Sequence, residues 1–81
     1  MHLLTKKLIM RHYVEQRNED CLYWYFQTLR DLGERAPYVK KADIYAVVAA
    51  RVYVSVDYCR KIICEMMRDE GAVARAAERV V

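Results

Sequence analysis

Residues 48–63, with the sequence VAARVYVSVDYCRKII, decide the fold of this chain. Between Arg51 and Tyr58 this stretch alternates valine with polar or aromatic residues, a pattern that is typical of a β-strand. A lone strand needs a partner, however, and the chain has no second alternating run bounded by turn residues. The same residues also fit two short helices that meet at a tight turn. We favour the helical interpretation.

Two helices joined in this way would bury a small set of residues between them. Ala49 would lie where the helices cross, since a larger side chain there would push them apart. Ser55 would cap the second helix. The predicted inner face consists of Ala49, Val52, Val54, Cys59 and Ile62.

This pattern resembles the helix-turn-helix motif of bacterial and phage DNA-binding domains. In that motif an alanine, a turn ending in an apolar residue and a serine or threonine, and two later apolar residues follow one another at similar spacings. The resemblance implies a helix-turn-helix at about 44–69, inside a homeodomain-like or sigma-factor-like domain. It also implies kinship with small proteins of phages and mobile elements.

One position departs from the family. Its members often have glycine where this chain has Tyr53, and a left-handed backbone would strain a tyrosine by roughly 1 kcal/mol. We therefore expect at Tyr53 either a slightly different turn, or a partly exposed ring that contacts a backbone phosphate.

The remainder of the chain is also helix-like. Residues 18–32 predict an amphipathic helix with Asn18 as its N-cap and Gly33 as its left-handed end. Residues 3–16 are helix-like with a less regular stripe, and either form a separate helix or continue into 18–32. The stripe of this first segment is formed by Leu4, Leu8, Ile9, Tyr13 and Val14.

The later elements are set by capping residues. Residues 33–41 predict a loop, a helix begins near Asp43, and another follows Ser55 and stops at Gly71. The tail 72–81 forms either a short helix or a frayed end. The expected fold is a single all-α domain over 1–81, a bundle of three to four helices.

Composition limits the function classes. The 81 residues are 56% hydrophobic and include two glycines and one proline, which argues against a disordered or all-β chain. The longest apolar stretch, 44–50, cannot span a bilayer, and no secretory signal is visible. We therefore expect a cytoplasmic protein with no membrane partner.

Catalytic and metal-binding motifs are missing from the sequence. The three cysteines Cys21, Cys59 and Cys64 form no C-x-x-C motif, which favours reduced thiols over a zinc site. There is no nucleophile–base pairing at a motif spacing and no glycine-rich phosphate loop. We expect no enzymatic activity, no cofactor, no metal and no small-molecule substrate.

The resemblance implies that a recognition helix at about 56–69 enters the major groove of double-stranded DNA. Arg60 is the best candidate for a guanine contact, and Lys61 would contact a base or a phosphate. Asp57 would accept from a cytosine amino group or stabilise the helix start. The net charge of +3 permits such binding without demanding it. The candidate DNA-binding residues are Lys40, Lys41, Tyr53, Ser55, Val56, Asp57, Arg60 and Lys61.

Four consecutive aromatic residues, 23–26, cannot all face one side of a helix. Tyr25 and Phe26 fit the core stripe, and we expect Tyr23 and Trp24 to pack against the N-terminal helix. The alternative for these two rings is the surface of a homodimer.

The function expected from the sequence is sequence-specific DNA binding, in a transcriptional regulator or a mobile-element accessory factor. The alternative is a small helical adaptor that docks a protein partner through the aromatic face around Trp24.

Overall fold

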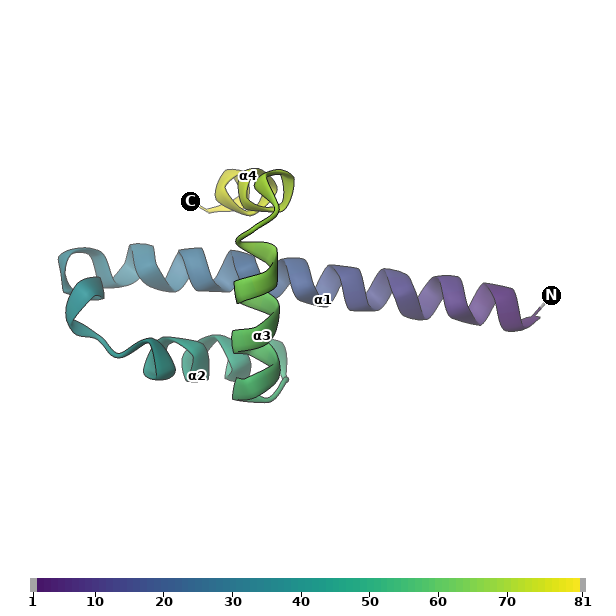
Figure 1. Ribbon diagram of the computed structural model, residues 1–81, viewed down its shortest axis with the longest axis horizontal. Helices are drawn as coiled ribbons and strands as arrows, with labels where there is room; N and C mark the ends of the chain where they lie inside the picture. The colour runs from purple at the N-terminus through teal and green to yellow at the C-terminus, as the bar shows by residue number, and fades with distance from the viewer. Residues whose placement is uncertain (1, 81) are drawn as a thin grey trace.

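The computed structural model describes the backbone of residues 2–80 and the side chains of residues 13–80. Its α-helices are α1 His2–Leu32, α2 Lys41–Val52, α3 Val56–Met66 and α4 Glu70–Arg79, with a 3-10 helix, η1 Gly33–Tyr38, between α1 and α2 (Figure 1). No strand occurs over residues 2–80, so residues 51–58 are helix and turn as predicted. The all-α class and the number of helices are confirmed.

Helix α1 is the element on which the others are assembled. Its 31 residues span about 46 Å, and it contacts α2, α3 and α4. Helix α2 runs back alongside α1, and α3 crosses α1. The N-terminal part of α1 extends past the other helices (Figure 1). The molecule is accordingly 52 Å long and 24 Å across in its second dimension.

The continuity of α1 settles one alternative and corrects two predictions. Residues 3–16 continue into 18–32, so Asn18 lies inside a helix and is not an N-cap. Because the N-terminal part extends away from the bundle, it does not fold back over Tyr23 and Trp24, and that expected packing is wrong. Of the stripe predicted for this segment, Leu4, Leu8 and Ile9 are not among the residues whose side chains are described. The other two members, Tyr13 and Val14, are exposed.

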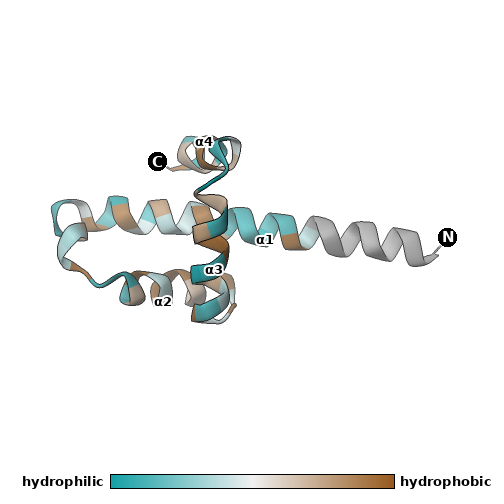
Figure 2. Cartoon of the chain, in the orientation of Figure 1, coloured by the Kyte–Doolittle hydropathy of each residue, from teal (hydrophilic) through white to brown (hydrophobic). Residues whose placement is uncertain are grey.

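All four helices contribute to the hydrophobic core. Its most deeply buried side chains belong to α1, α2 and α3, and Figure 2 shows apolar segments of α1 and α3 meeting where these helices cross. Of the predicted inner face, Ala49, Cys59 and Ile62 are buried, and Val52 and Val54 pack against them. The buried core cluster consists of Cys21, Leu22, Tyr45, Val48, Ala49, Cys59, Ile62, Ile63, Ala72 and Ala76.

The turn between α2 and α3 consists of three residues, 53–55. Tyr53 adopts the left-handed conformation, with φ 61° and ψ 43°, and its N–H and that of Val54 both donate to the Ala49 carbonyl. The prediction of a different turn is therefore wrong, because the tyrosine takes the conformation usually left to glycine. Ser55 caps α3 as predicted, its Oγ accepting from the Tyr58 N–H at 3.1 Å.

The ends of α1 and α2 confirm one predicted boundary and correct two. Gly33, with φ 57°, ends α1 in the left-handed conformation as predicted. The predicted loop 33–41 is mostly the 3-10 helix η1. Helix α2 begins at Lys41 with Lys40 as its N-cap, since the N–H groups of Asp43 and Ile44 both donate to the Lys40 carbonyl. Asp43 therefore lies in the first turn and is not the cap.

Helix α3 ends earlier than the sequence predicts. This helix ends at Met66, and Gly71 lies in the first turn of α4 instead of stopping α3. The reason is Asp69, whose carboxylate accepts from the N–H groups of Gly71 and Ala72 and so starts a new helix. The helix expected at 56–69 thus spans Val56–Met66, and most of the tail 72–81 is helical.

Small side chains and ion pairs hold α4 on α1. Ala72 and Ala76 are buried, which lets the two helices approach closely. Arg75 pairs with Glu19 and Arg79 with Asp20, each at 3.1 Å. Exposed ion pairs of this kind contribute little to stability. The apolar contact of α4 comes from the buried Ala72 and Ala76 and from Val73, which packs against the core.

Replacing Tyr53 by glycine should stabilise the fold. The Tyr53 side chain is 93% exposed, so the change loses little packing, and it removes the strain of a left-handed tyrosine. We expect the free energy of unfolding to rise by about 1 kcal/mol, which corresponds to roughly 4–8 °C in Tm for a domain of this size.

Tyr38→Gly is the matched control, because Tyr38 is also exposed but has no positive φ. Thermal unfolding followed by circular dichroism compares the two variants. A lower Tm for Tyr53→Gly would contradict the strain at this turn.

Candidate functional site

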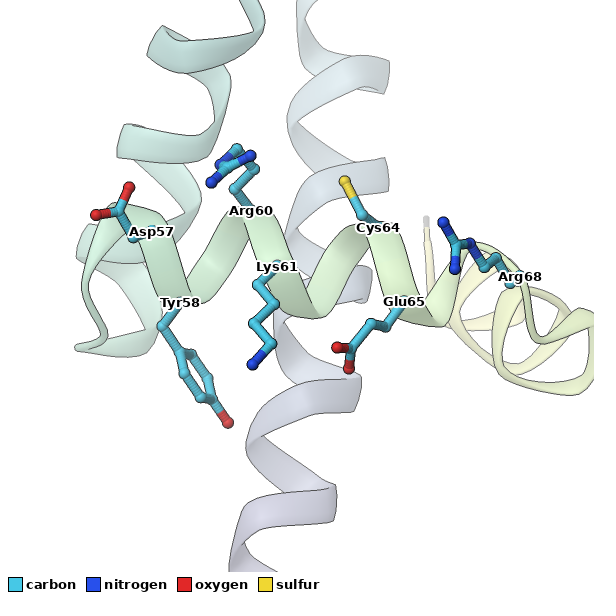
Figure 3. Close-up of a pocket in the computed structure, with 7 residues that line it drawn as sticks. All are labelled: Asp57, Tyr58, Arg60, Lys61, Cys64, Glu65 and Arg68. Atoms are coloured by element: carbon cyan, nitrogen blue, oxygen red, sulfur yellow. The ribbon is translucent and has the colours of Figure 1, made fainter.

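The outward face of α3 carries a cluster of charged side chains. Because Cys59, Ile62 and Ile63 are buried against α1 and α2, the opposite face of α3 is exposed to solvent. It forms a shallow hollow of about 600 Å³ whose lining is mainly polar (Figure 3). The lining residues are Asp57, Tyr58, Arg60, Lys61, Cys64, Glu65 and Arg68.

The side chains of this hollow diverge from the α3 axis. Figure 3 shows Arg60 and Cys64 on one side of the helix and Lys61 and Glu65 on the other, with Arg68 at its C-terminal end. Arg60 and Lys61 are adjacent in sequence but therefore reach in different directions.

The charge of this hollow is weakly positive. The lining contains three cations, Arg60, Lys61 and Arg68, and two carboxylates, Asp57 and Glu65, so its net charge is +1. The ion pairs found within 13–80 join α1 to α4 and do not include these cations. The three basic groups are consequently available to a ligand in solvent.

The structure brings together most of the predicted site residues. Ser55, Val56, Asp57, Arg60 and Lys61 are all exposed, as predicted for the outer side of this helix. The exposed ring of Tyr53 stands beside them at the turn.

Two predicted residues lie apart. Lys40 and Lys41 are exposed but stand at the N-terminal end of α2, whereas the turn follows its C-terminal end. The 12 residues of α2 separate them from the turn by about 18 Å. They do not contribute to the hollow on α3.

The structure adds residues that the sequence reasoning missed. Cys64 and Glu65 complete the outward face of α3, and Arg68 lines the hollow from just beyond the end of the helix. Helical spacing from Arg60 and Lys61 could have added these residues to the site. Arg17 of α1 lies over the Tyr58 ring, with its Cζ 5.4 Å from the ring centroid. The Tyr58 hydroxyl donates to Asn18 Oδ1 at 2.7 Å, and no local signal in the sequence marks this contact between residues 40 apart.

The aromatic cluster of α1 is largely covered by the chain itself. The Arg79 guanidinium lies 4.4 Å from the Tyr23 ring centroid, and that of Arg51 lies 4.5 Å from the Trp24 ring centroid. Tyr25 stacks on Tyr45 at 5.9 Å, as expected for a core residue. Tyr23 and Trp24 are thus half-buried, and a dimer through them stays a prediction.

The buried thiols have no reactive character. Burial raises the pKa of Cys21 to about 12, and the neighbouring Cys59 adds to this shift. Burial also raises the pKa of Cys59. Both thiols are therefore protonated at neutral pH and act as small apolar core residues, whereas Cys64 is exposed.

The described residues contain neither a candidate metal site nor a helix that could span a membrane. No group of three or more histidine, cysteine, aspartate or glutamate side chains there could hold a metal ion. None of the described helices is both long and apolar enough to cross a membrane.

The chain matches none of the protein-family models, curated proteins or solved structures with which it was compared.

The three thiols should differ sharply towards a thiol reagent such as Ellman's reagent. In the folded protein we expect only Cys64 to react rapidly at pH 7–8, because the other two thiols are buried and protonated. All three should react after denaturation, and Cys64→Ser should abolish the rapid phase. Rapid modification of two or more thiols in the native protein would contradict the buried arrangement.

Proposed function

We propose that this chain is a sequence-specific DNA-binding protein in which α3 enters the major groove of double-stranded DNA. The role that suits such a protein is that of a transcriptional regulator or a mobile-element accessory factor. The observation that carries the proposal is the division of α3 into a buried apolar face and an exposed face with Arg60 and Lys61. Arg68 follows just beyond the end of α3, and all three cations lie outside the described ion pairs.

Sterics support this role for α3. An α-helix with its side chains is about 10–12 Å across, and the major groove is about 12 Å wide. In Figure 1, α3 crosses in front of α1 and no other helix is drawn over it. Its outward face can therefore approach a duplex without rearrangement of the bundle.

The chemistry of individual residues suggests how the groove would be read. The Arg60 guanidinium can donate two parallel hydrogen bonds to guanine, the commonest specific contact with a base. Because Lys61 leaves α3 on the other side, we assign it to a phosphate at the edge of the groove. Asp57 would repel phosphate, so it suits either a cytosine amino group or the positive end of α3.

The remaining candidates extend this interface. Val56 is 41% exposed at the start of α3 and could meet a thymine methyl group. Lys40 and Lys41, about 18 Å from the turn along α2, would contact phosphates outside the groove. Two copies on a palindrome would raise both affinity and specificity.

The covered aromatic rings make the adaptor function the weaker alternative. Each of Tyr23 and Trp24 already carries an arginine side chain of the same chain, so less aromatic surface is left for a partner. The exposed basic groups Arg60 and Lys61 of α3, by contrast, take part in none of the ion pairs described within residues 13–80.

Binding to a random-sequence duplex at two salt concentrations tests the proposal. We expect measurable affinity at low salt that falls steeply as salt is added, because phosphate contacts release counterions. The measurement is fluorescence anisotropy or an electrophoretic mobility assay. Undetectable binding to any duplex at low salt would end the proposal.

Arg60→Ala should reduce the preference for one DNA sequence over another more than it reduces the affinity for DNA in general. Loss of a bidentate base contact costs about 1–3 kcal/mol of discrimination at one base pair. Arg30→Ala is the matched control, since Arg30 is exposed in the last turn of α1 and lines neither the hollow on α3 nor the turn. Sequence selection from a random pool compares the two, and equal selectivity for both variants would contradict the role of Arg60.

A further inference from the structure

We propose that Arg17, together with the hydroxyls of Tyr53 and Ser55, binds one phosphate of the DNA backbone beside α3. This inference rests on the proposed function, because it adds a contact to the same interface. Arg17 belongs to α1, whereas the other proposed DNA contacts lie on α2, on α3 and on the turn between them.

The three residues line one hollow at the junction of α1 with the turn. Arg17 comes from α1, Tyr53 and Ser55 from the turn, and Val54 and Tyr58 complete the lining around a volume of about 250 Å³. No carboxylate lines it, whereas the hollow on α3 contains Asp57 and Glu65. An anion in this hollow would therefore meet hydrogen-bond donors and no carboxylate of the lining itself.

Arg17 is held in place without being neutralised. Its guanidinium lies over the Tyr58 ring, at 5.4 Å, and that ring is fixed by the 2.7 Å hydrogen bond from its hydroxyl to Asn18. A guanidinium over an aromatic face keeps its N–H groups free to donate, and these groups match the geometry of a phosphate. The arginines of α4, by contrast, are occupied by carboxylates.

The turn supplies two further donors. Ser55 Oγ already accepts the Tyr58 N–H, which leaves its own hydroxyl proton for a ligand. Tyr53 is 93% exposed and is kept in a strained left-handed conformation, although its ring does not pack into the core. Strain at an exposed polar residue is typical of a functional position.

The position of the hollow fits a phosphate at the rim of the groove. Tyr58 lines both this hollow and the face of α3, so the two surfaces adjoin. Figure 3 shows Tyr58 leaving α3 on the same side as Lys61. Arg17 and Lys61 would therefore follow the backbone of one DNA strand while Arg60 reaches towards the bases.

Arg17→Gln tests this assignment, with Arg30→Gln as the control on the same helix. We expect Arg17→Gln to weaken binding roughly three- to tenfold for preferred and random duplexes alike, and to reduce the salt slope by about 1. Arg17→Lys should keep the slope, because it keeps the charge. Tyr53→Phe, which removes only the hydroxyl, should weaken binding in the same direction by a smaller factor.

The outcomes separate this inference from the proposed function. If the wild-type chain binds no duplex, the proposed function and this inference both fail. If the wild type binds and Arg60→Ala loses selectivity, but Arg17→Gln matches Arg30→Gln in affinity and salt slope, only the phosphate contact is overturned. A loss confined to one DNA sequence would also overturn it, since a phosphate contact acts on all sequences. Circular dichroism and the Tm confirm that Arg17→Gln is folded.

Discussion

The packing of α3 across α1 is the contact on which the rest of the molecule depends. Cys21 and Leu22 of α1 and Cys59 and Ile63 of α3 are each at most 1% exposed. Burying one leucine or isoleucine contributes about 1.5–3 kcal/mol, a large share of the stability of a domain this small. This contact fixes which face of α3 is hidden, and so which side chains are presented to solvent.

The continuous α1 helix makes that crossing possible. It provides a single surface on which α2, α3 and α4 all pack, while α2 and α3 also pack against each other beside the turn that joins them. The polar side chains of α1 then hold its partners in register: Glu19 and Asp20 bind α4, and Asn18 binds Tyr58 of α3. Residues that look like an N-terminal capping cluster in the sequence thus serve tertiary contacts.

Comparison of sequence and structure shows where local reasoning succeeds. The Ser55 cap, the Gly33 end and the burial of Ala49, Cys59 and Ile62 follow from short-range preferences and were predicted. Three features were not predicted: the role of Asn18, the Asp69 cap and the left-handed Tyr53. Each depends on a partner elsewhere in the chain, on a competing cap, or on strain imposed by the neighbouring helices. For the same reason the exposed basic face of α3 could be predicted, whereas the position of Arg17 over Tyr58 could not.

The most direct test of the account is a titration of the isotope-labelled chain with a DNA duplex, followed by amide chemical shifts in NMR. The account predicts that the largest shift changes occur at the outward residues of α3, around Asp57, Arg60 and Lys61, and that added salt reverses them. Amides at the buried crossing, such as those of Cys21 and Leu22, should stay nearly unchanged. Changes confined to the surroundings of Trp24, or no change at low salt, would contradict the account.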